Sequence, residues 1–180
     1  MSGWAADAVV CSGYKWLGGH GGVALAAMSP RLLEQVPPMT GWMGAPDPFD
    51  FNATMLAMAN DARRYTQSTM SYASVACLIA AAEELAAVGG ERIESHAMGL
   101  ARLLVEEAGR RGWMPFRSPS DGDGCAHIVA LSHPDRSAEA AARELESRRI
   151  VCSVRGGRIR VSIAPYNDES DIEAIVQALK

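Results

Sequence analysis

Lysine is almost absent from this sequence of 180 residues. Only two of the 17 basic residues, Lys15 and Lys180, are lysines, and all the others are arginines. A lysine amine can lose its proton when it is desolvated and can then attack a carbonyl group, whereas an arginine guanidinium stays charged. Lys15 is therefore a candidate for covalent chemistry rather than for charge alone.

The sequence also lacks an excess of positive charge and a long apolar run. A formal net charge of −4 gives no electrostatic basis for binding nucleic acid or an anionic membrane. The longest apolar run, Val75 to Ala82, is far shorter than the roughly 20 residues that span a bilayer, and no leader-like pattern opens the chain. We therefore expect neither nucleic acid nor a membrane as a partner, and a cytoplasmic location.

Pairs of cysteines at metal-ligand spacing are absent as well. The four cysteines are widely scattered along the chain, and the four histidines show no ligand spacing. The sequence therefore predicts no metal site, and it predicts four reduced, mostly buried cysteines: Cys11, Cys77, Cys125 and Cys152.

The first part of the chain is predicted to place Lys15 between two strands. Apolar runs predict strands over Ala8–Ser12 and Gly22–Met28, and the loop between them is rich in glycine. A short helix is expected over Pro30–Gln35. The segment from Pro37 to about Ser68 is long, irregular and rich in proline and methionine, so we expect it to form an interface.

The rest of the chain is predicted to hold two amphipathic helices followed by a β-α-β-β-α unit. This order favours helices on one face of a mainly antiparallel sheet, and the apolar stripe from Val75 onward is expected to be core. The predicted elements are a helix from about Val75 to Gly89, a helix from about Ile93 to Gly112, a strand over Cys125–Ser132, a helix over Ser137–Arg148, strands over Ile150–Val154 and Arg158–Ala164, and a helix over Asp168–Leu179.

Three blocks of the sequence, Asp7–Leu17, Arg64–Thr69 and Arg158–Asn167, together resemble the class V aminotransferase family. This is the fold-type-I group of pyridoxal 5′-phosphate (PLP) enzymes that includes cysteine desulfurases, kynureninases and isopenicillin N epimerase-like proteins. The resemblance implies an α/β fold that forms the C-terminal part of a fold-type-I PLP-dependent transferase. Residues 1–88 would be the remainder of the large PLP-binding domain, and residues 89–180 the small α+β domain.

The resemblance also implies roles around the lysine. Lys15 would form the Schiff base with PLP, and Ser12 and Tyr14 match positions that bind the cofactor phosphate, the second of which is commonly histidine. Thr69 matches a threonine that reaches the phosphate of the neighbouring subunit's cofactor, where the family usually has glycine at the position of Ser68. A helix N-cap by Ser68 or Thr69 is the alternative interpretation.

An arginine near the end of the chain is the expected contact for the substrate. Arg160 falls where the family places the arginine that binds the α-carboxylate of the amino-acid substrate, a task suited to a planar bidentate donor. Arg158 shares the strand face of Arg160 by period-two alternation, so one of the two is a plain surface charge in the alternative interpretation. Arg155 is a secondary candidate for substrate binding.

The cysteines help to separate the reactions of the family. Desulfurases that resemble this chain carry a nucleophilic cysteine on a loop between the last two strands. Here only Gly156 and Gly157 fill that interval, and Cys152 is expected inside the preceding strand, where apolar surroundings raise a thiol pKa. Aminotransferase, lyase or epimerase-like chemistry is therefore favoured over cysteine desulfuration.

The residues before Ala8 are too few to hold the upstream half of the family's large domain, which supplies a carboxylate to the pyridine nitrogen. One explanation is a split enzyme, a homo- or hetero-oligomer completed by a separate polypeptide that carries the N-terminal half. The other is a non-catalytic truncated relative that acts as an interaction or dimerisation partner of a full-length enzyme. The intact positions Ser12, Lys15 and Arg160 favour the first.

Overall fold

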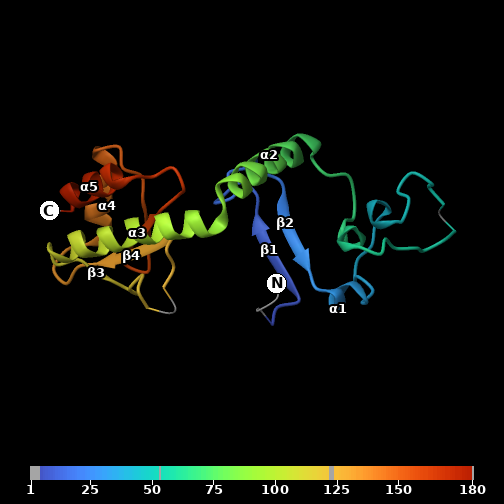
Figure 1. The fold of residues 1–180 in the computed structure, drawn as a ribbon, viewed down its shortest axis with the longest axis horizontal. Helices are drawn as coiled ribbons and strands as arrows, with labels where there is room; N and C mark the ends of the chain where they lie inside the picture. Colours follow the sequence, from blue (N-terminus) through green and yellow to red (C-terminus); the bar gives the residue numbers. More distant parts are fainter. Residues whose placement is uncertain (1–4, 53, 122–123, 180) are drawn as a thin grey trace. The chain divides into compact units, whose positions relative to one another are not determined.

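The chain divides into two compact units, Met1–Ala87 and Val88–Lys180 (Figure 1). The structure is a computed structural model that describes residues 5–52, 54–121 and 124–179. Lys15 belongs to the first unit and Arg160 to the second. The assignment of the two units to the large and small domains of the family stays a prediction.

The N-terminal unit begins with an antiparallel ribbon. Strand β1 (Ala8–Ser12) pairs with β2 (Ala24–Met28), and the register runs from Ala8 opposite Met28 to Ser12 opposite Ala24. The prediction of the first strand is confirmed. The second strand starts two residues later than predicted, because Gly22 takes a positive φ of 87° and ends the preceding turn.

Asp7 closes the open end of the ribbon. Its carbonyl oxygen accepts a hydrogen bond from Ser29 N at 2.7 Å, and its carboxylate accepts from Ser29 Oγ and Arg31 Nε, each at 2.9 Å. Hydrogen bonds from the Arg31 guanidinium, together with the one from Ser29, lower the pKa of the Asp7 carboxyl. Ser29 also caps the short helix α1 (Pro30–Leu33).

The long irregular segment holds two short 3₁₀ helices, η1 (Trp42–Gly44) and η2 (Ala62–Tyr65). Their backbones touch, because a Cβ on Gly44 would lie only 2.8 Å from Arg64 O, and a Cβ on Gly41 would overlap Gln67 O at 1.8 Å. Glycine is therefore required at both positions by close approach of backbone to backbone. The segment is folded on itself rather than open.

Helix α2 (Tyr72–Val88) buries little of its surface. Among its residues only Ser74 and Leu78 are buried, and Ile79 is 53% exposed. The prediction that the apolar stripe from Val75 onward is core is therefore wrong for this chain. The physical reason is that the two-stranded ribbon and its loop offer the helix only a small surface, which contacts it at Leu78.

The start of α2 settles the capping alternative. The helix begins at Tyr72, and Ser71 Oγ accepts a hydrogen bond from Ser74 N at 3.4 Å. The interpretation of Ser68 or Thr69 as the N-cap is therefore wrong, since the cap position belongs to Ser71.

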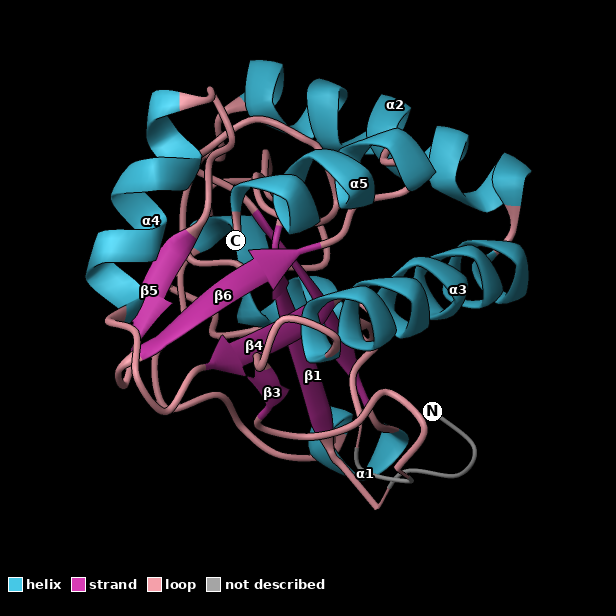
Figure 2. Ribbon diagram, turned by 90° about the vertical axis from the view of Figure 1, so that its left-hand side faces the viewer, coloured by secondary structure: helices cyan, strands magenta, loops and turns pink. Residues whose placement is uncertain are grey.

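The C-terminal unit is a three-helix layer over one antiparallel sheet. The strands lie in the order β3-β4-β6-β5, and Figure 2 shows α4 and α5 alongside β5 and β6. The predicted element order is confirmed, except that the sequence gives no sign of the two-residue strand β3. The elements are α3 (Gly90–Gly109), β3 (Met114–Pro115), β4 (Ile128–Ser132), α4 (Ala138–Ser147), β5 (Ser153–Arg155), β6 (Arg158–Ser162) and α5 (Glu169–Ala178).

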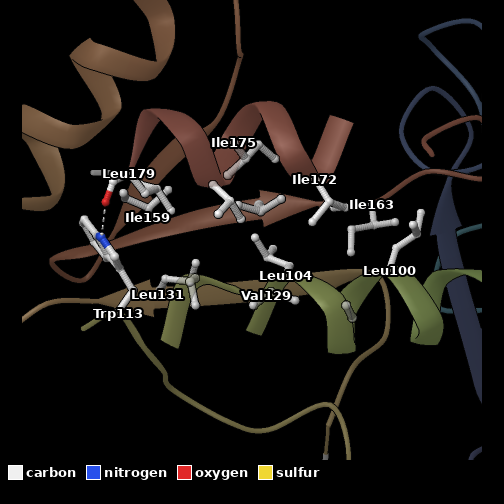
Figure 3. Packing of buried hydrophobic residues seen from close by; sticks show 14 of the residues in the cluster. Leu100, Leu104, Trp113, Val129, Leu131, Ile159, Ile163, Ile172, Ile175 and Leu179 are labelled. Carbon is white, nitrogen blue, oxygen red and sulfur yellow. Dashed lines mark hydrogen bonds between the residues drawn. The ribbon is translucent and has the colours of Figure 1, made fainter. Parts of the chain in front are cut away.

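The core of this unit lies between the helices and one face of the sheet (Figure 3). Val129 and Leu131 of β4 are buried opposite Val161 and Ile159 of β6, so the next residues along each strand point to the other face. Trp113 joins the layers, because its Nε1 donates to Leu179 O at 3.0 Å. The prediction of helices on one face of the sheet is confirmed.

No single helix in residues 5–52, 54–121 and 124–179 has the length and apolar content to cross a membrane. α2 and α3 have that length and apolar content only when the two helices are counted together across the break at Gly89. α3 buries an apolar stripe, and all of its residues except Ile93 belong to the core of the C-terminal unit. The stripe consists of Ile93, Ala97, Leu100, Ala101, Leu104 and Ala108.

Candidate functional site

Lys15 lies on a closed turn at the end of β1. Hydrogen bonds from Gly13 N to Val23 O at 3.0 Å and from Gly19 N to Gly13 O at 2.9 Å close the loop at its base. A third bond from Gly18 N to Lys15 O, also 3.0 Å, turns the chain around the lysine. The loop therefore presents the Lys15 side chain from a fixed backbone.

Helix α2 packs directly on this loop at a glycine. A Cβ on Gly19 would lie 3.0 Å from both Gly13 O and Leu78 Cα, and a Cβ on Gly13 would lie 2.9 Å from Val23 O. These neighbours are largely backbone atoms that cannot move independently of the fold. Glycine at these two positions therefore permits the approach of α2 that sets the position of the Lys15 turn.

The amine of Lys15 is accessible and has no acidic partner. The side chain is exposed, and its Nζ lies 5.6 Å from the centroid of the Tyr14 ring, which is 56% exposed. Within the described part of the chain, Lys15 forms no ion pair or hydrogen bond through its amine. The amine is therefore within reach of a carbonyl group, but it is not desolvated in this structure, and desolvation is the condition under which a lysine amine loses its proton and becomes reactive.

The other residues predicted to bind the cofactor lie in the same unit. Ser12 is the half-buried last residue of β1, Tyr14 lies on the turn, and Thr69 is exposed in the irregular stretch before α2. Ser12 and Tyr14 are thus adjacent to Lys15 by chain connectivity. Their roles, and that of Thr69, in holding a phosphate stay predictions.

A polar network behind the loop was not predicted from the sequence. His20 Nδ1 lies 3.1 Å from Ser74 Oγ, and Ser74 Oγ lies 2.9 Å from Ser71 Oγ. Ser74 is only 4% exposed, so these bonds satisfy a buried hydroxyl and tie the loop to α2. The sequence feature that could have predicted this network is the pair of serines, Ser71 and Ser74, at the start of an otherwise apolar helix.

Arg160 lies on the face of the C-terminal sheet that the helices leave uncovered. It is opposite Ala130 of β4 and Ser153 of β5. Its Nε is buried without a hydrogen-bond partner, and so is Ser153 Oγ, while Arg155 is exposed and its Nη1 donates to Val154 O at 2.9 Å. An unpaired guanidinium on this face can take a carboxylate from outside the unit.

All four cysteines are free, but the expectation that most are buried is wrong. Cys77 and Cys125 are exposed, and Cys11 and Cys152 are half-buried. Cys152 precedes β5 rather than lying inside it, because the strand begins at Ser153. Burial, with a contribution from the negative charge of Glu146, raises the pKa of the Cys152 thiol, as expected.

The turn between β5 and β6 is as short as the sequence predicts. Only Gly156 and Gly157 connect the strands, both with positive φ, 55° and 68°. Such a pair of left-handed residues makes a tight hairpin turn. The connection between β5 and β6 is therefore too short to form a loop that carries a nucleophilic cysteine.

The order of the lysine turn, the segment before α2 and the β6 arginine agrees with one known family. The family model described as Aminotransferase class-V matches residues 1–175. This chain belongs to the class V aminotransferase family. No curated protein matches the chain.

Solved structures that share this fold include a cysteine desulfurase and an aminotransferase. The cysteine desulfurase CsdA from Escherichia coli has a TM-score of 0.78 and 24% identity, with 96% of this chain and 45% of that chain covered. A variant of the protein C-DES with glycine covalently linked to its PLP cofactor has a TM-score of 0.82 and 20% identity, with 99% and 46% covered. Alanine–glyoxylate aminotransferase from Nostoc sp. has a TM-score of 0.69 and 17% identity, with 99% and 48% covered.

These similarities establish the fold. The α/β chain forms part of a fold-type-I PLP-dependent enzyme, as the sequence predicts, and it spans less than half the length of each of these neighbours. In the C-DES variant, PLP is the group to which glycine is linked.

The close packing at Gly19 predicts a specific loss of order in the loop. We expect Gly19→Ala to lower the stability of the folded loop by about 1 kcal/mol or more, because the new Cβ meets backbone atoms on two sides. The backbone amide of Gly13, which donates to Val23 O, should then exchange its hydrogen about fivefold faster, or more, than in the unmodified chain. Gly21→Ala is the matched control, since a Cβ there has nothing within 4 Å. Equal exchange rates in the two variants would contradict this packing.

The raised pKa of Cys152 predicts slow alkylation. A raised pKa keeps the Cys152 thiol neutral as the pH rises, and this thiol is half-buried, so Cys152 should be alkylated more slowly than the exposed Cys77. Iodoacetamide labelling followed by mass spectrometry at pH 7 to 9 measures both rates in one sample. Modification of Cys152 as fast as Cys77 at pH 7 would show an activated cysteine and contradict this expectation.

Proposed function

We propose that this chain supplies Lys15 and Arg160 to a PLP site that acts on an amino-acid substrate. A second polypeptide, which carries the N-terminal half of the fold, completes the site. The observation that carries the proposal is the exposed amine of Lys15, held on a glycine-closed turn in a chain of the class V aminotransferase family. A cytoplasmic location is part of the same proposal.

The residues around Lys15 fit the cofactor. The amine is free to bond an aldehyde carbon, and the hydroxyl groups of Ser12 and Tyr14 can donate hydrogen bonds to a phosphate. Gly18, with a φ of 72° and open space at its Cβ position, lets a ligand approach the backbone. When bound, PLP supplies an electron sink for negative charge that develops at the substrate Cα.

The chain's own residues would divide the remaining work. Lys15 would hold the cofactor covalently, and once the substrate amine replaces it, the free Lys15 amine would move a proton to or from the substrate Cα. Arg160 would hold the substrate α-carboxylate through two parallel hydrogen bonds, which orients the bond to be broken.

The structure of the last hairpin supports a reaction other than cysteine desulfuration. The two-residue turn at Gly156 and Gly157 leaves no loop for a nucleophilic cysteine, and Cys152 is half-buried with a raised pKa. We therefore propose aminotransferase, lyase or epimerase-like chemistry. The neighbours of known structure include both a cysteine desulfurase and an aminotransferase, so their fold is compatible with either class.

Exposed apolar surface supports the need for a partner. In the described part of the N-terminal unit, Ala59 and Leu78 are the only buried hydrophobic residues. Burial of apolar surface is the main force that stabilises a fold, and monomers rarely leave large apolar patches exposed. The large exposed side chains of this unit are Val10, Tyr14, Trp16, Leu25, Val36, Met39, Trp42, Phe49, Phe51, Met55, Leu56, Met70, Tyr72 and Ile79.

An aromatic cluster favours a second candidate function. Trp42, Phe49 and Phe51 lie with their ring centroids 6.0 to 6.2 Å apart, and Phe49 and Phe51 are 66% and 72% exposed. Such a surface fits a non-catalytic chain that dimerises with a full-length relative through this segment. In that case Lys15 would not be needed for the activity of the assembly.

Trapping of the cofactor tests the role of Lys15. We expect borohydride reduction of the full chain with PLP to label Lys15 in preference to other amines, because its amine is exposed and the hydroxyl groups of Ser12 and Tyr14 beside it can donate hydrogen bonds to the PLP phosphate. Peptide mapping by mass spectrometry identifies the site. Lys15→Arg should remove the label, whereas Lys180→Arg, which changes the only other lysine, should keep it. Equal labelling of Lys180 or of the N-terminal amine would contradict a special site at Lys15.

Co-expression with a polypeptide that carries the N-terminal half of the fold separates the two candidates. The catalytic proposal predicts turnover of an amino acid by the assembly and its loss in Lys15→Ala. Turnover that is unchanged in Lys15→Ala would support the interaction protein instead.

A further inference from the structure

The uncovered face of the C-terminal sheet carries more positive charge than one carboxylate requires. Arg155 of β5 is opposite Arg158 of β6, and Arg160 follows on the same face. Within the described residues, none of these arginines forms an ion pair. The other strand residues on this face bring no acid, and they are Ile128, Ala130, Ser132, Met114, Ser153 and Ser162.

Arg158 is held in a defined orientation. Its guanidinium carbon lies 4.3 Å from the centroid of the Phe116 ring, and its Nη1 donates to Gly156 O at 3.1 Å. The backbone of Phe116 is tied to β4, because its N–H donates to Ala130 O at 2.8 Å, while its side chain is 60% exposed. An aromatic ring under a guanidinium limits its motion and leaves the opposite side free for an anion. These contacts favour a role for Arg158 beyond that of a surface charge.

The two β6 arginines can contact two anionic groups of one small molecule. Residues two apart on a strand lie about 7 Å apart and point to the same side. Arg158 Nε, Arg160 Nε and Ser153 Oγ are all buried and without hydrogen-bond partners in the described structure. Buried polar groups are normally satisfied, so three unsatisfied ones on one face are typical of a site that receives a ligand.

We infer that Arg158, supported by Phe116, selects an amino-acid substrate whose side chain carries a second anionic group. Arg160 takes the α-carboxylate in this arrangement, so that assignment rests on the proposed function. Arg158 takes the side-chain carboxylate or another anion of similar size. The preference for a doubly anionic amino acid is a property of this face and can be measured without the cofactor.

Titration of the full chain with L-glutamate and L-glutamine tests this inference, because the two differ by one charge at nearly equal size. The Nε–Hε resonances of Arg158 and Arg160 in a ¹⁵N-labelled sample report binding. We expect glutamate to bind about fivefold more tightly than glutamine, the effect of one additional exposed charge pair. Both resonances should shift with glutamate, and chiefly that of Arg160 with glutamine.

Variants assign the preference to one side chain. Arg158→Gln should bring the glutamate-to-glutamine ratio to about one while glutamine affinity stays the same, whereas Arg160→Gln should weaken both ligands. Phe116→Leu should lower the ratio, because it removes the ring beneath the guanidinium. Arg102→Gln on α3 removes the same charge from an exposed site away from this face and should change neither affinity.

Three results would overturn the inference. The first is a glutamate-to-glutamine affinity ratio near one for the unmodified chain, and the second is a preference for glutamate that persists in Arg158→Gln. The third is binding of an acidic peptide to this face without binding of either amino acid. The outcome is separable from that of the proposed function. PLP labelling at Lys15 without a glutamate preference overturns this inference alone, whereas a glutamate preference without labelling at Lys15 overturns the proposed function alone.

Discussion

Burial of apolar side chains is unevenly divided between the two units, and the division governs what each can do. In Val88–Lys180, three helices cover one face of a four-stranded sheet and enclose a continuous core. Hydrophobic burial is the dominant stabilising term, so this unit can hold Arg160 on a rigid strand by itself. The described residues of the N-terminal unit bury only Ala59 and Leu78 as hydrophobic groups. The position of Lys15 therefore depends on backbone hydrogen bonds and on close contacts at Gly13 and Gly19.

Strand β6 shows how one strand serves both stability and recognition. Its alternate residues Ile159 and Val161 are buried against the helices, while Arg158 and Arg160 point to the uncovered face. The packing of the core fixes the register of β6. A shift of one residue would bury both arginines, and the free energy needed to bury two unpaired charges is far larger than any gain from the new packing. The unpaired guanidinium groups are thus kept on the open face by the packing on the opposite one.

Local signals predicted most of the fold, and non-local burial explains the failures. Ser137 and Asp168, where the sequence predicts the last two helices to begin, cap α4 and α5, since capping depends only on neighbouring residues. The apolar stripe of α2 looked like core, yet whether it is buried depends on which surfaces meet it. The contact of Phe116 with Arg158 was unpredicted for the same reason, since it joins two residues far apart in sequence. The motifs around Lys15 and Arg160 indicated the family. The binding of a cofactor phosphate beside Lys15 and of a substrate carboxylate by Arg160 stay predictions.

Hydrogen exchange measured by mass spectrometry tests the central proposal, that surface from another polypeptide completes the Lys15 unit. The full chain is compared alone and with a polypeptide that carries the N-terminal half of the fold. The account predicts that amides in Ala8–Ser12, Ala24–Met28 and residues 36–52 exchange more slowly in the mixture, while those of β4 and β6 are unchanged. Exchange in the ribbon that is already as slow as in β4 and β6, or that does not change on mixing, would contradict it.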